Sequence, residues 1–246
     1  MDFTDTGFVL SARRHGESDI ILSCLTHEHG RHLGLVKGGA GRKNRPAFEI
    51  GNQLSVNWRA RLSEQLGYFQ AELIEANIAH LIDDADRLAA MSAAAAVIDA
   101  TLPEREPHQD VHDDFAVLVQ GLVTAVPDWA GLYLRWELKL LADLGFGLDL
   151  SRCAVTGATA DLIFVSPKTG RAVSREGAGR YAERLLPLPA FLLKDNLTTD
   201  ATSLAQGLRL TGHFIHGHLL PTSAAEKRLT ARDRLIERLT MGRHSR

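Results

Sequence analysis

The stretch Gln53-Leu54-Ser55-Val56-Asn57-Trp58 decides the fold class, because its polar and apolar residues alternate with period two. Such alternation is typical of a half-buried β-strand. Four further short apolar runs lie around it, at residues 8–10, 20–25, 33–36 and 68–74. Five short strands separated by turns predict a small barrel within residues 1–79. An OB-fold is the expected form of a five-stranded barrel, with an SH3-like barrel and an open sheet as alternatives.

The remaining chain, residues 80–246, has mostly helical patterns. Residues 88–98 are rich in strong helix formers and are followed by Pro103 and Pro107, which end a helix. A second helix is predicted over residues 110–126. A third is predicted from a capping Asp128 to Gly145, with apolar residues recurring every three or four positions.

The C-terminal third combines an irregular segment with further helices. Residues 151–179 contain many glycines and read as irregular. Helices are predicted over residues 203–219 and after Pro221, where Ser223 and Glu226 have the spacing of a capping box. We therefore predict an α+β protein, in which a five-stranded OB-fold barrel precedes a mostly α-helical domain with a ribbon-like insertion at about residues 151–179.

The net charge of −2 hides strong segregation of charge along the chain. Residues 31–61 contain seven basic residues and one acidic residue, a net charge of +6. Residues 80–150 contain four basic and thirteen acidic residues, a net charge of −9. Residues 151–246 contain fifteen basic and eight acidic residues, a net charge of +7. Such asymmetry points to a polyanion as a partner.

The loop Lys37-Gly38-Gly39-Ala40-Gly41-Arg42-Lys43-Asn44-Arg45 is the most informative stretch for function. Its glycines let the backbone approach a phosphate closely, and its cations supply charge. It lacks the Gly-Lys-Ser/Thr ending of a nucleotide-binding P-loop. The alternative is a solvated flexible loop with incidental charge. The predicted DNA-contacting residues are Lys37, Arg42, Lys43, Arg45, Arg59, Arg61, Arg13 and Arg14.

Three aromatic residues near these cations, Trp58, Tyr68 and Phe69, are candidates for stacking on bases. We expect at least two of them to pack in the core instead. Arg13 and Arg14 lie at a predicted strand end, where a phosphate contact and a plain solvated turn are both possible.

The last predicted helix is strongly basic. Its cations suit either an ordinary amphipathic helix, a second phosphate-contacting surface or a protein-docking surface. We assign protein binding to Arg228, Arg232, Arg234 and Arg238.

Metal binding and catalysis find little support in the sequence. Cys153 and Thr156 have the spacing of half a zinc ribbon, but the chain has only two cysteines, so a zinc-free ribbon is expected. We interpret the histidines as surface or half-buried groups rather than ligands; they are His27, His29, His32, His213, His216 and His218. We interpret acidic residues such as Asp83, Asp84, Asp86, Asp113 and Asp114 as solvated helix faces.

Known signatures of enzymes and membrane proteins are also missing. No nucleophile elbow, His-Glu-x-x-His pattern or dinucleotide fingerprint is present. We therefore expect no enzyme activity, no catalytic residue, no cofactor and no metal. The chain has no run of eighteen apolar residues, which a membrane span needs, and its start is not basic and apolar, as a secretory signal would be. A cytoplasmic location is therefore expected.

Several motifs taken together resemble the RecO family. Gly7-Phe8-Val9-Leu10 is followed by Gly16-Glu17-Ser18-Asp19, an apolar strand, Thr26, Gly30 and Val36-Lys37-Gly38. Later, Leu144-Gly145-Phe146 precedes Cys153 and Thr156-Gly157. Residues 164–174 look like a zinc-free version of the family's ribbon, since three of the four cysteine positions of zinc-binding members are absent. The resemblance runs from about Asp5 to Leu239.

The resemblance implies a mediator of DNA repair and recombination. It implies binding of single- and double-stranded DNA, annealing of complementary strands and help in loading RecA. The implied partners are RecR and the acidic C-terminal tail of single-strand-binding protein, and the implied location is the nucleoid. Lys37 and Arg42 match the family's DNA-contacting loop best. The alternatives are an RNA-binding OB-fold protein, a nuclease using the acidic residues and a protein-docking scaffold.

Overall fold

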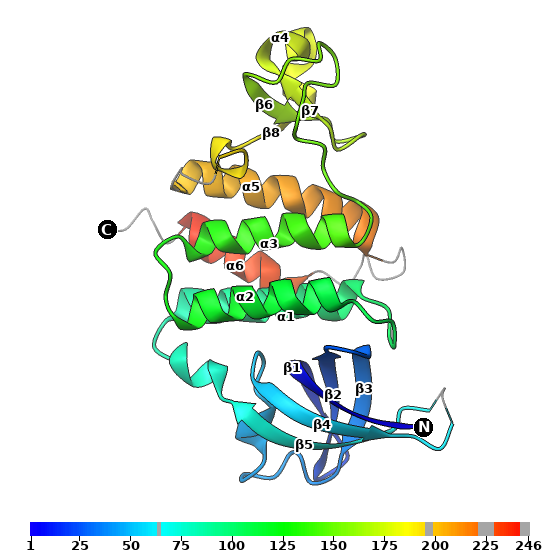
Figure 1. Ribbon diagram of the computed structural model, residues 1–246. Helices are drawn as coiled ribbons and strands as arrows, with labels where there is room; N and C mark the ends of the chain where they lie inside the picture. The colour runs from blue at the N-terminus through cyan, green and yellow to red at the C-terminus, as the bar shows by residue number, and fades with distance from the viewer. Residues whose placement is uncertain (63–64, 195–198, 221–228, 242–246) are drawn as a thin grey trace. The chain divides into compact units, whose positions relative to one another are not determined.

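A computed structural model describes residues 1–62, 65–194, 199–220 and 229–241 (Figure 1). The chain forms two compact units. The first comprises residues 1–125 and 229–235, and the second comprises residues 126–228 and 236–246. The barrel strands end at Glu75, and the first unit also contains the two helices that follow. The domain boundary near residue 79 stays a prediction.

Five strands form the barrel of the first unit: β1 (Asp2–His15), β2 (Asp19–Thr26), β3 (Gly30–Val36), β4 (Gln53–Arg59) and β5 (Tyr68–Glu75). They pair in the order β1-β2-β3-β5-β4, and β4 pairs with β1 to close the ring. All neighbours are antiparallel except β3 and β5, which pair in parallel at Leu35 and Tyr68. This arrangement confirms the predicted five-stranded OB-fold.

The alternation in β4 sorts its side chains as the sequence predicts. Leu54, Val56 and Trp58 point into the barrel core, where they pack with Phe69 of β5. Gly67 leaves room for the indole, because a Cβ at residue 67 would lie 2.5 Å from Trp58.

His32 departs from the sequence-based expectation. It lies on the inward face of β3 and is only 6% exposed, and its ring packs against those of Phe3 and Trp58. Burial lowers its pKa to about 4. The prediction of a surface or half-buried histidine is therefore wrong here, because strand alternation places residue 32 inside the barrel.

The helices of the first unit are η2 (Asn77–His80), α1 (Ala85–Thr101) and α2 (Gln109–Val123), and a short η1 (Arg45–Phe48) lies before β4. The Asp84 carboxylate caps α1 by accepting the N–H groups of Arg87 and Asp86, and these hydrogen bonds lower its pKa. Asp84 therefore stabilises the N-terminus of α1. The predicted first and second helices are both present, but α2 ends at Val123, and Ala125 adopts a left-handed φ of 56°.

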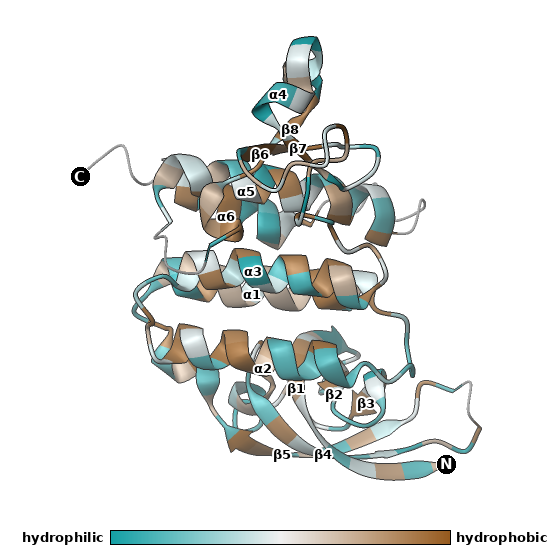
Figure 2. Ribbon diagram, turned by 45° about the horizontal axis from the view of Figure 1, so that its top comes forward, coloured by the Kyte–Doolittle hydropathy of each residue, from teal (hydrophilic) through white to brown (hydrophobic). Residues whose placement is uncertain are grey.

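Helix α1 packs on the barrel through a partly buried polar junction. The carboxylate of Asp99 accepts hydrogen bonds from Ser23 (2.6 Å) and Ser11 (3.0 Å) and pairs with Arg31 at 3.3 Å. Helix α2 combines hydrophobic and hydrophilic positions (Figure 2), and it buries Val111, Phe115, Leu118 and Leu122.

The second unit begins with α3 (Trp129–Asp143), which packs against α5 (Ala201–Phe214). A single turn of π-helix, η5 (Ile215–Leu219), follows α5. Asp128 occupies the predicted capping position of α3, but its side chain makes no capping hydrogen bond; it accepts one from Thr199 at 3.1 Å.

Between α3 and α5 lies the predicted ribbon-like insertion. A three-stranded sheet is formed by β6 (Leu162–Val165), β7 (Ala172–Ser174) and β8 (Leu186–Pro187), in the order β7-β6-β8. The short helical segments α4 (Arg175–Ala178), η3 (Gly179–Arg184) and η4 (Ala190–Leu192) accompany it.

The last helix is α6 (Thr230–Met241). The predicted capping pair, Ser223 and Glu226, lies outside the described residues. Among the helices that the structure describes, none combines the length and the apolar character needed to span a membrane.

Candidate nucleic-acid interface

A groove of about 700 Å³ lies on the barrel between the loop after β3 and the strands β4 and β5. We call it the basic groove. It is lined by Leu35, Val36, Lys37, Lys43, Asn44, Ala47, Phe48, Asn57, Arg59, Tyr68, Phe69, Gln70 and Ala71. Three of these residues are cations and none is acidic. The groove therefore offers positive charge together with amide groups and one phenol ring.

Strand alternation places the groove residues on one face. Asn57 and Arg59 of β4 point outward, because Trp58 between them points into the core. Tyr68 and Gln70 of β5 flank the buried Phe69 in the same way. In the register of the sheet, Arg59 pairs with Tyr68 and Asn57 pairs with Gln70, so the four side chains form a compact group.

The loop that forms the other wall is held by hydrogen bonds. The Gly38 N–H donates to the Asp19 carboxylate at 2.8 Å, and the Ala40 N–H donates to the Ser18 carbonyl at 2.8 Å. Gly38 has a φ of +66°, which favours glycine. The hydrogen bond from Gly38 is also the main reason why the pKa of Asp19 lies below its ordinary value. The backbone thus fixes the path of the loop, while Arg42, Lys43 and Arg45 are exposed on it.

The charges of the groove are available to an anion. Lys37 Nζ lies 5.2 Å from the centre of the Tyr68 ring, a cation–π arrangement. Arg59 pairs with Asp2 at 3.6 Å, but both side chains are exposed, and such pairs contribute little. Within the described part of the chain, no carboxylate lies within ion-pair distance of Lys37 or Lys43.

The three candidate stacking residues divide as expected. Trp58 and Phe69 are each 3% exposed and belong to the core, whereas Tyr68 is 52% exposed. The expectation that at least two of them pack in the core is confirmed. Tyr68 is the aromatic side chain that the groove presents to solvent.

The other predicted DNA-contacting residues divide between two further grooves and the exposed surface. Arg61 shares an adjoining groove with Arg59 and Tyr68. Arg14 and Arg45 line a smaller groove of about 290 Å³, which also includes Phe48. Arg13 and Arg42 are exposed but line none of these three grooves.

Sequence reasoning missed the amide side chains Asn44, Asn57 and Gln70. The alternation of β4 and β5 was the available signal, because it places Asn57 beside Arg59 and Gln70 beside Tyr68.

Arg31 is a cation of the basic segment that does not serve the interface. Its guanidinium is occupied by Asp99 and by the Leu102 carbonyl at 2.9 Å, so it supports the fold.

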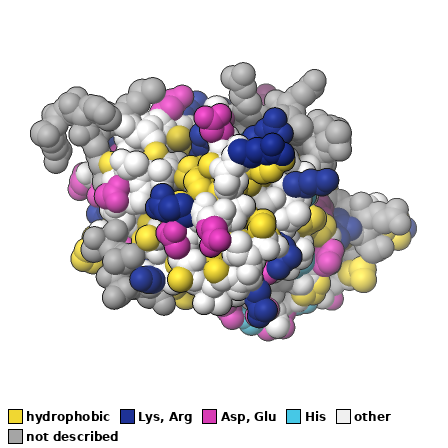
Figure 3. Space-filling view, turned by 90° about the horizontal axis from the view of Figure 1, so that it is seen from above, with side chains coloured by type: hydrophobic (Ala, Val, Ile, Leu, Met, Phe, Trp, Pro, Cys, Tyr) yellow, Lys and Arg dark blue, Asp and Glu magenta, His cyan; other side chains and the backbone are white. Residues whose placement is uncertain are grey.

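The C-terminal arginines do not form one exposed set. Arg234 and Arg238 are exposed on α6, whereas Arg232 is only 2% exposed, and Arg228 lies outside the described residues. Arg232 is removed from the predicted protein-binding surface, because a buried guanidinium does not meet a partner. On the face that Figure 3 shows, basic and acidic side chains are interspersed.

The insertion places a single thiol where a zinc ribbon would gather four ligands. Cys153 Sγ accepts N–H groups of Ser174 at 3.2 Å and of Val155 and Thr156 at 3.4 Å. A Cβ at Gly177 would lie 2.8 Å from the same sulfur. Burial raises the pKa of Cys153, but the hydrogen bonds from Ser174 and Thr156 lower it by more, so the resulting pKa is about 6. One thiolate, two hydroxyls and a glycine are not the donor set of a structural zinc site.

An OB-fold barrel with a basic groove and an exposed aromatic ring has the features that single-strand-binding proteins use. Residues 1–77 match the family model for the N-terminal part of recombination protein O, and residues 82–224 match the model for its C-terminal part. The chain therefore belongs to the RecO family of DNA repair proteins.

Curated relatives agree with the family models over nearly the whole chain. A DNA repair protein RecO of Cereibacter sphaeroides is 48% identical over 97% of this chain and 98% of its own length. The DNA repair protein RecO of Rhodospirillum rubrum is 45% identical over 97% of this chain and 96% of its own. The DNA repair protein RecO of Sinorhizobium medicae is 45% identical over 89% of this chain and 87% of its own length.

Proposed function

We propose that this chain is a non-enzymatic mediator that binds single- and double-stranded DNA, anneals complementary strands and assists RecA loading together with RecR. The observation that carries the proposal is the basic groove. It brings Lys37, Lys43 and Arg59 to one face of the barrel, beside an exposed Tyr68. Membership of a family of DNA repair proteins supports a nucleic acid as the ligand.

In this proposal the groove binds the strand through its phosphates and one base. Lys37, Lys43 and Arg59 neutralise phosphates along the groove, and Tyr68 stacks on a base. Asn57 and Gln70 accept and donate hydrogen bonds without selecting a sequence, because their amides suit several base edges. Each neutralised phosphate of a single strand contributes a slope of about −0.7 to the dependence of log K on log salt.

Annealing follows from the same charges. Two complementary strands repel each other through their phosphates, and cations placed between them reduce the repulsion. Arg14 and Arg45 line a separate groove, and Arg13, Arg42 and Arg61 are also exposed on the first unit, so a second strand or a duplex finds cations outside the basic groove. For the acidic tail of single-strand-binding protein, we propose the exposed Arg234 and Arg238.

The test is annealing of complementary fluorescently labelled strands by the wild type and by the variant K37A/K43A/R59A. The control variant R171A/R175A/R180A removes the same charge from exposed positions of the insertion. We expect the groove variant to lose most of the annealing rate and the control variant to retain it. Equal annealing by all three proteins contradicts the proposal. Tighter competition by RNA than by DNA of the same sequence favours an RNA-binding function instead.

A further inference from the structure

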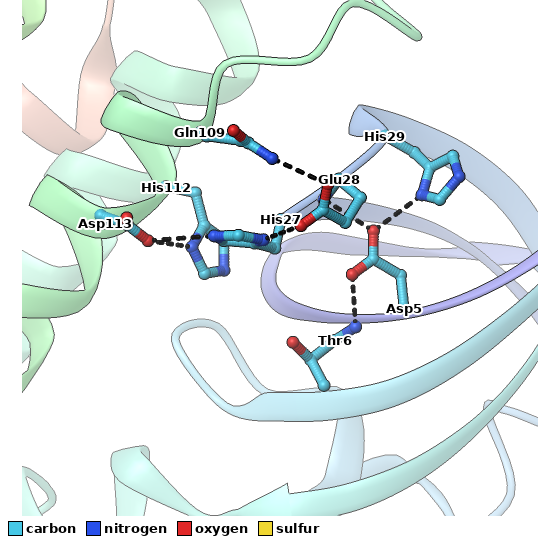
Figure 4. A network of polar contacts seen from close by, with 8 residues as sticks. All are labelled: Asp5, Thr6, His27, Glu28, His29, Gln109, His112 and Asp113. Atoms are coloured by element: carbon cyan, nitrogen blue, oxygen red, sulfur yellow. Dashed lines mark hydrogen bonds and ion pairs between the residues drawn. The ribbon is translucent and has the colours of Figure 1, made fainter.

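A cluster of titratable side chains lies where the turn between β2 and β3 meets the first half of α2, within the first unit (Figure 4). His27 comes from the turn, and His112 and Asp113 come from the helix. One carboxylate oxygen of Asp113 lies 3.1 Å from His112 Nδ1 and 3.4 Å from His27 Nε2. The two imidazole rings stand nearly perpendicular, with their centres 4.8 Å apart.

Outer groups hold His27 in this orientation. Its Nδ1 lies 2.7 Å from Glu28 Oε1, and the Gln109 amide donates to the other Glu28 oxygen at 2.7 Å. The Asp5 carboxylate accepts the backbone N–H of Glu28 at 2.9 Å. An imidazole that donates from Nδ1 to a carboxylate presents a lone pair on Nε2, and this arrangement is usual for histidines that bind metals.

The inner histidine, His112, is not fully satisfied by its neighbours. His112 is only 6% exposed, and its ring centre lies 5.3 Å from that of Phe8 in β1. His112 Nε2 is buried without a hydrogen-bond partner in the described structure. When His27 donates to Glu28, its Nε2 lone pair faces the Asp113 carboxylate, and a proton or a cation between them is needed to make the contact favourable.

We propose that His27, His112 and Asp113 bind a divalent transition-metal cation such as zinc. In a tetrahedral site with bonds of about 2.0–2.1 Å, neighbouring ligand atoms are about 3.4 Å apart. The two separations from the Asp113 oxygen, 3.1 and 3.4 Å, are close to that value. The candidate ligand atoms of the three residues all lie within 4.8 Å of one another, so small rotations of the exposed Asp113 and half-buried His27 complete the site.

The chemistry of the ligands selects the class of metal. Two imidazoles and a carboxylate suit zinc, nickel or copper, whereas magnesium and calcium require oxygen ligands. Three protein ligands leave a position for water. The cation joins the β2–β3 turn to α2, so its expected role is to stabilise the packing of that helix on the barrel. The sequence analysis expected no metal; this site joins His27 to two residues that are far from it along the chain, His112 and Asp113.

The test measures zinc uptake by the metal-free, full-length chain, by competition with a chromogenic chelator at about pH 7.5. We expect one zinc ion per chain and a rise in the melting temperature on addition of zinc. D113N and H27Q each lower the affinity by roughly tenfold or more, and E28Q lowers it less. Asp113 is exposed, so D113N is expected to fold normally, which circular dichroism checks.

Two control variants make the result specific. Asp110 is an exposed carboxylate of the same helix, and Cys153 is the thiolate of the insertion, so D110N and C153S should bind zinc like the wild type. Absence of zinc uptake by the wild type overturns the proposal. Uptake that survives D113N and H27Q, or that C153S abolishes, overturns it as well. None of these readouts involves DNA, so their failure and the failure of the proposed function are distinguishable.

Discussion

Replacing Tyr68 by alanine removes the exposed aromatic ring of the basic groove. Stacking of one base on an aromatic side chain contributes about 1–3 kcal/mol, which corresponds to about a 5- to 140-fold loss of affinity for a single strand. Tyr68 is half exposed, and Lys37 covers one face of its ring, which leaves the other face for a base. Full burial of a large apolar side chain contributes about 1.5–3 kcal/mol, so the loss of stability should stay near 1 kcal/mol.

Fluorescence anisotropy with a labelled single strand at low salt measures the effect. The matched control is Y68F, which keeps the ring and should bind within about twofold of the wild type. Tyr68 is a cleaner target than its neighbour Trp58, because removal of a buried tryptophan costs about 3–5 kcal/mol of stability and disturbs the barrel itself. Wild-type affinity in Y68A would refute the stacking role.

Three further predictions concern the framework. G34A should destabilise the barrel by about 1–3 kcal/mol in chemical denaturation, because a Cβ at residue 34 would lie 2.5 Å from the Phe69 ring. D99A should cost about 3 kcal/mol, because it removes the nearer carboxylate partner of Arg31, leaving Glu104 at 3.9 Å, and the acceptor of Ser11 and Ser23, while D99N should cost less. The Cys153 thiol should ionise near pH 6, visible as thiolate absorbance that C153S lacks. Because its pKa of about 6 lies below the ordinary 9.0, its contribution to stability is present above pH 9 and is lost as pH falls through about 6.

The barrel and the helices were predictable because their patterns are local. The alternation at Gln53–Trp58 depends only on one face being buried, and it correctly sorts Leu54, Val56 and Trp58 inward. The alanine-rich run at residues 88–98 predicts α1 from helix propensity. The family resemblance, based on the order of short motifs, is confirmed by the family models and relatives.

The arrangement of side chains in the groove was not predictable, because it depends on contacts between distant segments. The loop after β3 is held by contacts with another segment, such as the hydrogen bond from Gly38 to Asp19, and in this loop Lys43 lines the basic groove but Arg42 does not. Arg31 belongs to the same basic segment but is occupied by Asp99. Arg232 reads as a surface residue in the sequence, yet it is buried.

The most direct test of the central claim is the salt dependence of single-strand binding by K37A/K43A/R59A, with R171A/R175A/R180A as the charge-matched control. If the three groove cations each neutralise one phosphate, at about 0.7 per contact, the slope of log K against log salt should become shallower by about 2.1 in the groove variant alone. Affinity at low salt should fall with it, while thermal stability stays near that of the wild type. A groove variant with the affinity and slope of the wild type would contradict the assignment of DNA binding to the basic groove.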